Sequence, residues 1–399
     1  MTIKRFLRTF KSVTKKIQMK KTILYSIAIA IAIIIGYLAL PKNYYLRRAL
    51  IYQKVNIEDY TIFSNREIPS DKYVPWKIDD RYNKKEIPDS LLQKIESFNP
   101  VAFLVIQDST IVFEKYWKGY HKDSLSNSFS MAKSIVSLLV GAAIDEGLIE
   151  SVHQPVAEFI PEYQNDKNCQ LQLRDVLNMS SGLNWEESYS GPFSLTTKAY
   201  YGNNLHDLIA NLEVVEKPGE TFKYLSGDTQ LLAFIVQAAT NKNISQYTYE
   251  KFWKYMGAKN SALWCLDNEN GMEKAYCCFN STAQDFARWG QLILTHGNCN
   301  GKQLISNDYL SMALSPARYL KTDKGKPVDF YGFQWWMLPD YKGMNIKYMR
   351  GILGQYVIVI PEKNAVVVRL GQDRSTQRYK EVHPQDMIDD IEAALAILE

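Results

Sequence analysis

The feature that most restricts this chain is an uncharged apolar run near its N-terminus. Residues 23–40 read ILYSIAIAIAIIIGYLAL, and Pro41 follows them. As a helix, this run extends roughly 27 Å, which is about the thickness of the hydrocarbon core of a bilayer. Elements of soluble domains rarely stay apolar on every side over such a length. We therefore expect a membrane-spanning helix at residues 23–40.

The residues before this run are strongly basic. They carry eight cations and no acid: Lys4, Arg5, Arg8, Lys11, Lys15, Lys16, Lys20 and Lys21. Cations beside a membrane span favour the cytoplasmic side, so residues 41–399 are expected on the periplasmic or extracellular side. A cleaved signal peptide is the alternative, but no A-x-A site follows the apolar run. The pattern favours an uncleaved signal anchor.

The rest of the chain has the composition of a folded globular protein. Charged residues make up 23% and hydrophobic residues 46% of the sequence, which excludes general disorder. The whole chain has 47 Lys and Arg against 43 Asp and Glu. Eight of these cations and none of the acids belong to the leader, so the rest of the chain is mildly acidic. A body of this charge argues against nucleic acid as a partner.

Cysteine and histidine patterns do not indicate a metal site. The five cysteines form no C-x-x-C pair, and the five histidines lack metal-ligand spacing. We therefore expect no metal and no other cofactor. One or two disulfides and buried free thiols are both compatible with the cysteine positions, which are Cys169, Cys265, Cys277, Cys278 and Cys299.

Strand patterns occur at both ends of the soluble part, with helix patterns between them. Two hairpins are expected, one over 102–120 turning at 108–110 and one over 354–372 turning at 361–364. Helices are expected at 131–146, 173–179, 205–212, 228–240, 283–294 and 386–398. This order predicts an α+β domain whose antiparallel sheet comes from both termini. We divide the chain into a leader (1–22), an anchor (23–40), a stalk and N-terminal extension (41–98) and the main domain (99–399).

The strongest candidate for chemistry is the pair Ser130 and Lys133. It opens the helical sequence SMAKSIVSLLVGAAIDEG, in which positions three apart share a face. A lysine whose pKa is lowered by burial can remove the proton of a nearby serine and make it a nucleophile. The N-terminal N–H groups of the helix favour the negative charge that then develops. An N-cap serine beside a solvated lysine is the structural alternative, since S-x-x-K also occurs at Ser12.

Two further motifs follow the Ser-Lys pair along the chain. PGETFKYLSGD places Tyr224 in a loop before a helix, where a tyrosine can act as acid and base if nearby cations lower its pKa. RGILGQY, residues 350–356, places glycines at a strand start, where they allow close backbone approach to a ligand. Either motif alone is usually structural.

Together and in this order, the three motifs resemble the serine β-lactamase-like superfamily, especially class C β-lactamase-related esterases and 6-aminohexanoate-dimer hydrolases. The resemblance covers roughly residues 60–399 and includes LQLRDVLNMSSGL and YGFQWWM. It implies a β-lactamase/transpeptidase-like fold and a serine hydrolase that forms an acyl-enzyme.

The resemblance also implies roles for individual residues. Ser130 would be acylated, Lys133 would be its base, and Tyr224 would protonate the leaving group and activate the deacylating water. The backbone N–H groups of Ser130 and Gln355 would form the oxyanion hole, next to Gly354. Ser226 takes the place of the Asn in the family's Y-x-N motif.

The third motif departs from that of antibiotic-hydrolysing relatives. Ile352 and Leu353 replace the Lys and the hydroxyl residue of K-T-G, which would help to bind a substrate carboxylate. An ester or amide with a less anionic acyl group therefore fits better than a β-lactam. Trp335 and Trp336 either line such an acyl pocket or belong to the core.

Three functions remain open at this point. The first is a membrane-anchored hydrolase of a small-molecule ester or amide. The second is a non-catalytic, penicillin-binding-like envelope protein, which the altered motifs would suit. The third is a D,D-peptidase or β-lactamase, which Ile352 and Leu353 disfavour.

Overall fold

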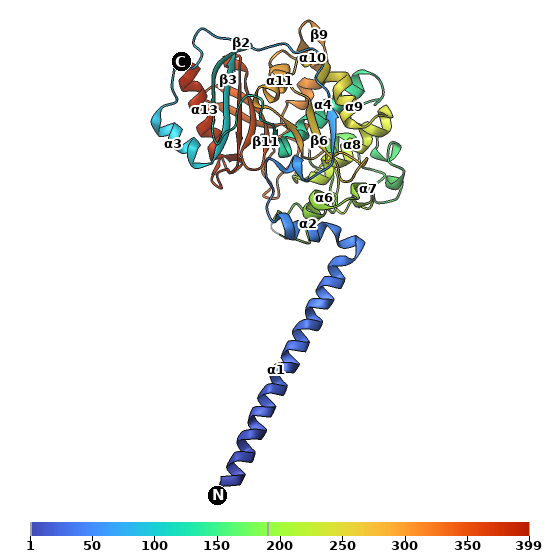
Figure 1. Cartoon of the computed structure of the whole chain (residues 1–399). Coiled ribbons are helices and arrows are strands. Elements are labelled where there is room, and N and C mark those ends of the chain that lie inside the picture. Colours follow the sequence, from blue (N-terminus) through green and yellow to red (C-terminus); the bar gives the residue numbers. More distant parts are fainter. Residues whose placement is uncertain (1, 190, 399) are drawn as a thin grey trace.

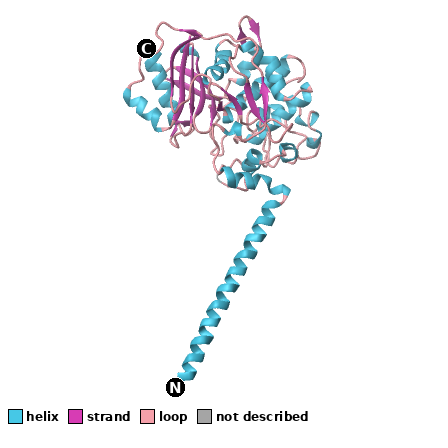
Figure 2. Cartoon of the chain, viewed as in Figure 1, coloured by secondary structure: helices cyan, strands magenta, loops and turns pink. Residues whose placement is uncertain are grey.

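Apolar strands from the two ends of the chain form the main sheet of the computed structural model, which describes residues 2–189 and 191–398. The strands lie in the order β10-β11-β12-β13-β3-β4-β2, and all neighbours are antiparallel except β2 and β4. Their bounds are β2 Lys77–Ile78, β3 Pro100–Gln107, β4 Thr110–Tyr116, β10 Trp336–Tyr341, β11 Met344–Gly351, β12 Gln355–Ile360 and β13 Ala365–Gly371. The two expected hairpins are confirmed as β3–β4 and β12–β13, and they join where β13 pairs with β3. Figure 2 shows the strands (magenta) inside the body, with helices (cyan) on both sides of them.

Both faces of this sheet are covered, which explains why its central strands are apolar at consecutive positions. In β13, Val366 and Val368 enter the core shared with the helical region, whereas Ala365 and Val367 enter the core on the opposite face. Helices α13 (Gln385–Leu398) and α3 (Asp89–Ser97) cover that opposite face, and α11 (Ala283–Leu294) packs on the other (Figure 1).

The helical region is built around α4 (Ala132–Asp145) and α8 (Ser226–Thr240), which pack on each other. The expected helices all occur, and their ends agree within a few residues. Shorter helices complete the region: α5 Leu173–Leu177, α6 Leu195–Tyr201, α7 Leu205–Ala210, α9 Ile244–Thr248, α10 Lys254–Met256 and α12 Asn307–Ala313. Of these, α6, α9, α10 and α12 have no counterpart among the expected elements.

A second, smaller sheet was also not expected from the sequence. Its four strands lie in the order β1-β6-β7-β5. They are only two to four residues long, too short for an alternating pattern to stand out: β1 Asn65–Ile68, β5 Ser126–Asn127, β6 Ala262–Cys265 and β7 Phe279–Ser281. Two-residue ladders also pair β8 (Asn298–Cys299) with β9 (Lys302–Gln303) and β14 (Arg378–Tyr379) with β15 (His383–Pro384).

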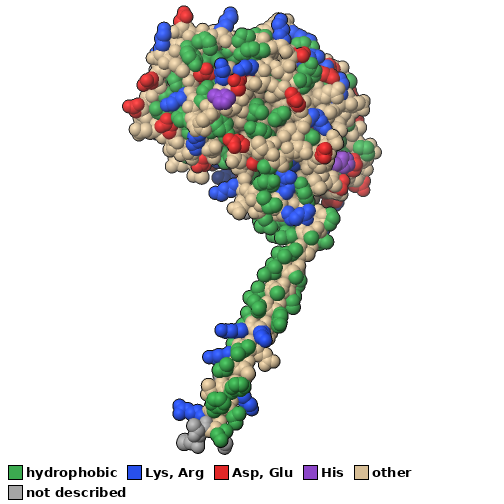
Figure 3. Space-filling view, in the orientation of Figure 1, with side chains coloured by type: hydrophobic (Ala, Val, Ile, Leu, Met, Phe, Trp, Pro, Cys, Tyr) green, Lys and Arg blue, Asp and Glu red, His purple; other side chains and the backbone are tan. Residues whose placement is uncertain are grey.

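Helix α1, Thr2–Ala39, projects from one end of the body (Figure 1). It is longer than the expected span because the basic leader continues the same helix, with cations on its N-terminal half and apolar side chains beyond them (Figure 3). Within the described residues, one helix is long and apolar enough to cross a membrane, over Arg5–Ala39, and no part of its apolar window is buried.

Residues 41–98 lie against the body. A short 3-10 turn, Pro41–Asn43, joins α1 to α2 (Tyr44–Tyr52), which packs on α6 through buried residues that include Tyr45 and Leu46. Further along, β1 pairs with β6 and β2 pairs with β4. The segment expected to begin as a stalk therefore starts with a helix that is packed on the main domain, because one side of that helix is apolar.

Candidate active site

Ser130 lies in a short 3-10 turn, Phe129–Met131, which leads directly into α4. The turn follows β5 of the small sheet, and Asn127 Oδ1 accepts a hydrogen bond of 2.8 Å from the N–H of Phe129. Ser128 N donates to Phe279 O on β7 at 2.8 Å. Phe129 has a φ of +43°, a conformation that a bulky residue keeps only when its surroundings enforce it. The small sheet therefore fixes the position of Ser130.

Lys133 lies one helical turn further on, with its side chain buried. Its Nζ contacts three acceptors: Ser130 Oγ at 3.3 Å, Ser226 Oγ at 3.1 Å and the carbonyl oxygen of Tyr276 at 2.8 Å. An ammonium group has three protons, so these contacts satisfy it completely. The predicted neighbourhood of Ser130 and Lys133 is present, and the solvated lysine of the structural alternative is not.

Burial lowers the pKa of Lys133 to about 8, although the carboxylates of Glu187 and Asp228 favour its charged form. Burial removes the water that stabilises the ammonium form, and the two carboxylates compensate for this loss only in part. Near neutral pH a fraction of the lysine is therefore neutral and able to accept the proton of Ser130.

Tyr224 reaches the same hydroxyl from the segment before α8. Its phenol interacts with Ser130, and this interaction favours the phenolate. Its ring centroid is 5.2 Å from Lys133 Nζ and 5.4 Å from the ring of Trp336. Ser130, Lys133 and Tyr224, which are far apart in the sequence, thus converge on one point.

The pKa of Tyr224 is raised, whereas a role as both acid and base was expected to need nearby cations that lower it. Arg350, Arg374 and the interaction with Ser130 do favour the phenolate, but burial outweighs them and raises the pKa of Tyr224 to about 12. Tyr224 is therefore a phenol at neutral pH, suited to donating a proton rather than to removing one.

Ser226 and Glu187 form the next layer around Lys133. The Glu187 carboxylate accepts hydrogen bonds from Ser226 N at 2.7 Å, Ser226 Oγ at 2.8 Å, Trp185 Nε1 at 2.7 Å and the Tyr189 hydroxyl. Ser226, the residue in the Asn position of Y-x-N, thus joins Lys133 to a carboxylate. Glu187 is not predictable from the sequence, because one acid among 43 carries no spacing signal.

The turn between β11 and β12 forms another side of the site. A Cβ atom on Gly351 would lie only 2.3 Å from Ser128 O, so glycine is required for this strand end to approach the Ser130 turn. Ile352 and Leu353 then line the same cleft as Ser130. Within the described residues, the backbone N–H groups of Ser130 and Ile352 have no hydrogen-bond acceptor.

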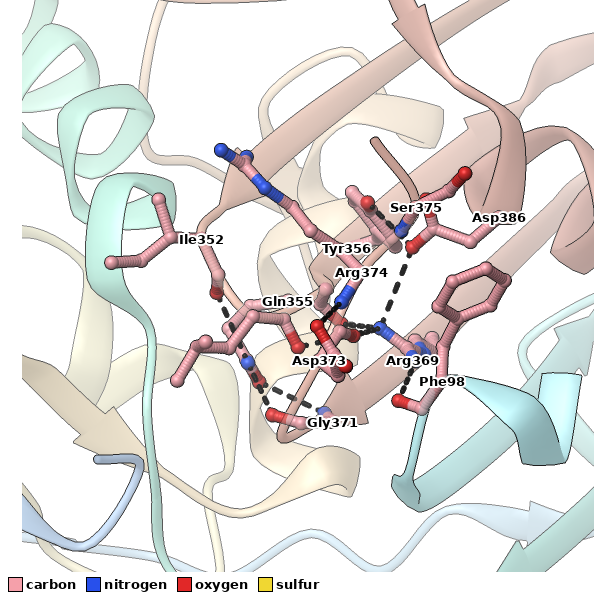
Figure 4. Close-up of polar contacts among 12 residues, drawn as sticks. Phe98, Ile352, Gln355, Tyr356, Arg369, Gly371, Asp373, Arg374, Ser375 and Asp386 are labelled. Carbon is pink, nitrogen blue, oxygen red and sulfur yellow. Dashed lines mark hydrogen bonds and ion pairs between the residues drawn. The ribbon is translucent and has the colours of Figure 1, made fainter. Parts of the chain in front are cut away.

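Gln355 and Gly354 have different places from those expected. Gln355 is buried at the start of β12, and its side-chain amide nitrogen donates to Gly371 O at 2.7 Å and to Ile352 O at 3.2 Å (Figure 4). Gly354, at a φ of +78°, leaves room for the buried Arg369, whose Nη1 donates to Gly354 O at 2.7 Å. The close approach that this glycine allows is therefore that of Arg369. Gln355 and Arg369 both stabilise the turn through hydrogen bonds to its backbone carbonyl groups.

Trp335 and Trp336 belong to the packing of the domain. Trp335 is fully buried in the core on the helical side of the sheet. Trp336 packs between the Tyr224 ring and the Arg350 guanidinium, which lies 3.6 Å from its ring centroid. Both tryptophans belong to the buried cores, and neither is among the described residues that line the cleft.

The cleft in front of Ser130 has a volume of about 1120 Å³. Its lining includes Ser226, Ile352 and Cys277, which forms a disulfide with its neighbour Cys278. Cys169, Cys265 and Cys299 are free thiols, so one of the disulfides considered from the sequence is present. Within the described residues, no group of three or more His, Cys, Asp or Glu side chains is arranged to hold a metal ion.

Comparisons with known proteins show the family and the fold of this chain. A family model described as Beta-lactamase matches residues 90–389. A 6-aminohexanoate-dimer hydrolase of Paenarthrobacter ureafaciens is 29% identical over 300 residues, which cover 71% of this chain and 75% of that protein.

Solved structures share the fold. A Bacillus anthracis protein assigned to the 6-aminohexanoate-dimer hydrolases superposes with a TM-score of 0.73 at 20% identity, over 86% of this chain and 92% of that one. A family VIII carboxylesterase gives a TM-score of 0.60 at 16% identity, over 78% of this chain and 99% of that one. From the family match over most of its length, the chain belongs to the beta-lactamase family of serine hydrolases.

Proposed function

We propose that this chain is a membrane-anchored hydrolase that cleaves an ester or amide through an acyl-enzyme on Ser130. The observation that carries the proposal is the buried Lys133 amine, 3.3 Å from Ser130 Oγ and with a pKa lowered to about 8. Burying an ammonium group costs free energy, so a lysine without a role in the site would keep its amine in water.

In the acylation step, neutral Lys133 takes the proton of Ser130 as Oγ attacks the substrate carbonyl. The N–H groups of Ser130 and Ile352, which lack other acceptors, stabilise the oxyanion. We assign the second donor to Ile352 rather than to Gln355, because Ile352 lines the cleft and Gln355 is buried behind it.

The leaving group departs with a proton from the Tyr224 phenol, which recovers its proton from the Lys133 ammonium. Deacylation uses the same groups: neutral Lys133 takes a proton from the water that attacks the acyl carbonyl, the Lys133 ammonium returns this proton through Tyr224 to Ser130, and the acid is released. Because the pKa of Tyr224 is about 12, we assign the general base of both acylation and deacylation to Lys133. Tyr224 then transfers the proton from the Lys133 ammonium to the leaving oxygen or nitrogen.

The substrate class follows from the cleft wall. Ile352 and Leu353 present apolar side chains where a carboxylate-binding Lys and hydroxyl would be needed for β-lactams. An ester or amide with an uncharged acyl part fits this wall. The names of the carboxylesterase and of the 6-aminohexanoate-dimer hydrolase support the same two bond types.

The membrane part of the proposal rests on α1, whose apolar side chains are exposed and whose N-terminal half is basic. Exposed apolar surface of this length is stable in lipid and not in water. We place the leader in the cytoplasm and the body on the periplasmic or extracellular side.

Labelling of the full-length protein with a fluorophosphonate tests the proposal. We expect the probe to modify Ser130 and the label to disappear in Ser130→Ala. Ser12→Ala is the matched control, because it removes the serine of the other S-x-x-K sequence. Absence of labelling, or labelling that survives Ser130→Ala, would contradict the hydrolase and favour a non-catalytic envelope protein. Rapid hydrolysis of a cephalosporin would contradict the substrate class.

A further inference from the structure

Helix α2 follows the apolar helix α1 without a flexible linker. The Asn43 side chain donates to Tyr37 O at 2.7 Å, and Arg47 donates to the carbonyl oxygens of Leu38 and Leu40. These contacts satisfy carbonyl groups that the end of a helix leaves free. If α1 crosses a bilayer, α2 therefore lies at the surface of that bilayer, at the end of the body from which α1 projects (Figure 1).

One side of α2 packs on protein, and its other side exposes large apolar residues. Tyr45 and Leu46 are buried on the side toward α6, and the ring of Tyr52 stacks on Tyr201 at 6.1 Å. Leu50 and Ile51 are 58% and 71% exposed. A helix with one side packed on protein and large apolar residues on its free side is suited to a membrane interface.

The same helix forms part of the wall of the active-site cleft. Ala49 and Tyr52, followed by residues 53–56, line the cleft together with Ser130. Tyr189, Gly191 and Pro192 also line it, and Phe193, next along the chain, is 65% exposed. Exposed apolar residues thus occur on α2, which directly follows α1, and at Tyr189 and Phe193 on another part of the cleft wall.

We propose that the cleft opens at the outer surface of the membrane and that its substrate is an amphiphilic ester held in the outer leaflet. The acyl chain enters between α2 and the wall formed by Tyr189 and Pro192, while Leu50, Ile51 and Phe193 rest in the lipid interface. This inference rests on the proposed function, because it needs both the Ser130 acyl-enzyme and the anchor. It adds the direction of entry and the physical state of the substrate.

The advantage of this arrangement is that the substrate need not pass through water. A long acyl chain leaves a bilayer at a cost that grows with each methylene group. A cleft wall that touches the interface lets the ester move from lipid to Ser130 while the chain stays in contact with apolar surface. A cleft for a water-soluble ester would have no need of exposed apolar residues beside its mouth.

The test uses the full-length protein in phosphatidylcholine vesicles and two esters with the same leaving group. 4-Nitrophenyl palmitate is dissolved in the vesicles and 4-nitrophenyl acetate in the water. The variants are Ile51→Glu and Phe193→Glu, which place a charge in the interface. Ile78→Glu is the matched control, since Ile78 is 56% exposed and lies on β2, at the other end of the body (Figure 1).

We expect Ile51→Glu and Phe193→Glu to lower kcat/KM for the palmitate about tenfold and to leave that for the acetate within about twofold. Ile78→Glu should change neither value. Equal losses on both esters, no loss on the palmitate, or a changed oligomeric state in Ile51→Glu would each overturn the inference. Turnover of the acetate but not of the palmitate by the unmodified protein would also overturn it while leaving the proposed function intact. Failure to hydrolyse either ester would overturn both.

Discussion

Replacing Glu187 with glutamine should move the acid limb of the activity profile to lower pH. Glu187 is joined to Lys133 through Ser226 Oγ and favours the charged form of the lysine. Glutamine has the same shape. Its oxygen can accept from Trp185 and from the backbone of Ser226, and its NH₂ group can donate to the hydroxyls of Ser226 and Tyr189, which are able to accept. The substitution therefore removes charge and keeps the contacts.

The size of the change follows from the geometry. Two hydrogen bonds of 3.1 and 2.8 Å separate Lys133 Nζ from Glu187 Oε1, so the charges are at most about 6 Å apart. With an effective dielectric constant of about 20, their attraction is about 2.8 kcal/mol, equivalent to about 2 pH units. Because Glu187 is partly exposed, solvent screening reduces this, and we expect the pKa of Lys133 to fall from about 8 by about one.

The assay is the pH dependence of kcat/KM for a chromogenic ester, with Ser130→Ala as the blank. The acid limb reports the free enzyme's base and should move from near pH 8 to near pH 7. At pH 7 the neutral fraction of Lys133 rises from about a tenth to about a half. Above pH 9 the variant should be the slower enzyme by about threefold, since its base is weaker.

Glu186→Gln removes the same charge from the neighbouring exposed residue and should leave the limb in place. An unmoved limb in Glu187→Gln would refute the assignment of Lys133 as the base that Glu187 tunes. A loss of about 10² or more at every pH would instead make Glu187 itself the general base.

Four further outcomes follow from the site and its supports. Lys133→Ala and Tyr224→Phe should each lower kcat/KM by about 10² to 10⁴, measured on protein with an unchanged circular dichroism spectrum. Gly351→Ala should lower kcat by about 10² at little cost in KM, because its Cβ would press on the backbone beside the nucleophile. Arg369→Met should lower the melting temperature, since it leaves the buried carbonyl groups that the guanidinium binds without a donor. Burial lowers the pKa of His383 to about 3 in the folded protein, against a usual value of 6.5. Between these two values only the unfolded chain takes up the proton, so stability falls as the pH falls. The melting temperature should therefore decrease between pH 6 and pH 4, and it should decrease less steeply in His383→Gln.

Elements with a regular pattern could be predicted from the sequence. The helix that carries Lys133, the two hairpins and the terminal helix follow from spacing alone, because their side chains alternate or repeat along one element. The β5 strand could not be predicted in this way. Ser126 and Asn127 are polar and the strand has two residues, so only its pairing with β7 defines it.

The site was predictable in part for the same reason. Ser130, Lys133 and Tyr224 carry local motifs, and their order along the chain matches a family. Glu187 carries none, since its role depends on Ser226 and Lys133 lying beside it in space. The resemblance implies Gln355 as an oxyanion-hole donor, whereas Ile352 is the residue of this turn that lines the cleft next to Leu353.

By itself, the sequence determined the apolar span, the α+β order of elements and the candidate nucleophile with its lysine, because each depends on residues close together in the chain. Only the tertiary structure decided the protonation states and the surroundings of the site. The lowered pKa of Lys133 and the raised pKa of Tyr224 arise from burial, which depends on segments far away in sequence. In the same way, only packing brings α2, next to the apolar helix, into the wall of the cleft that holds Ser130.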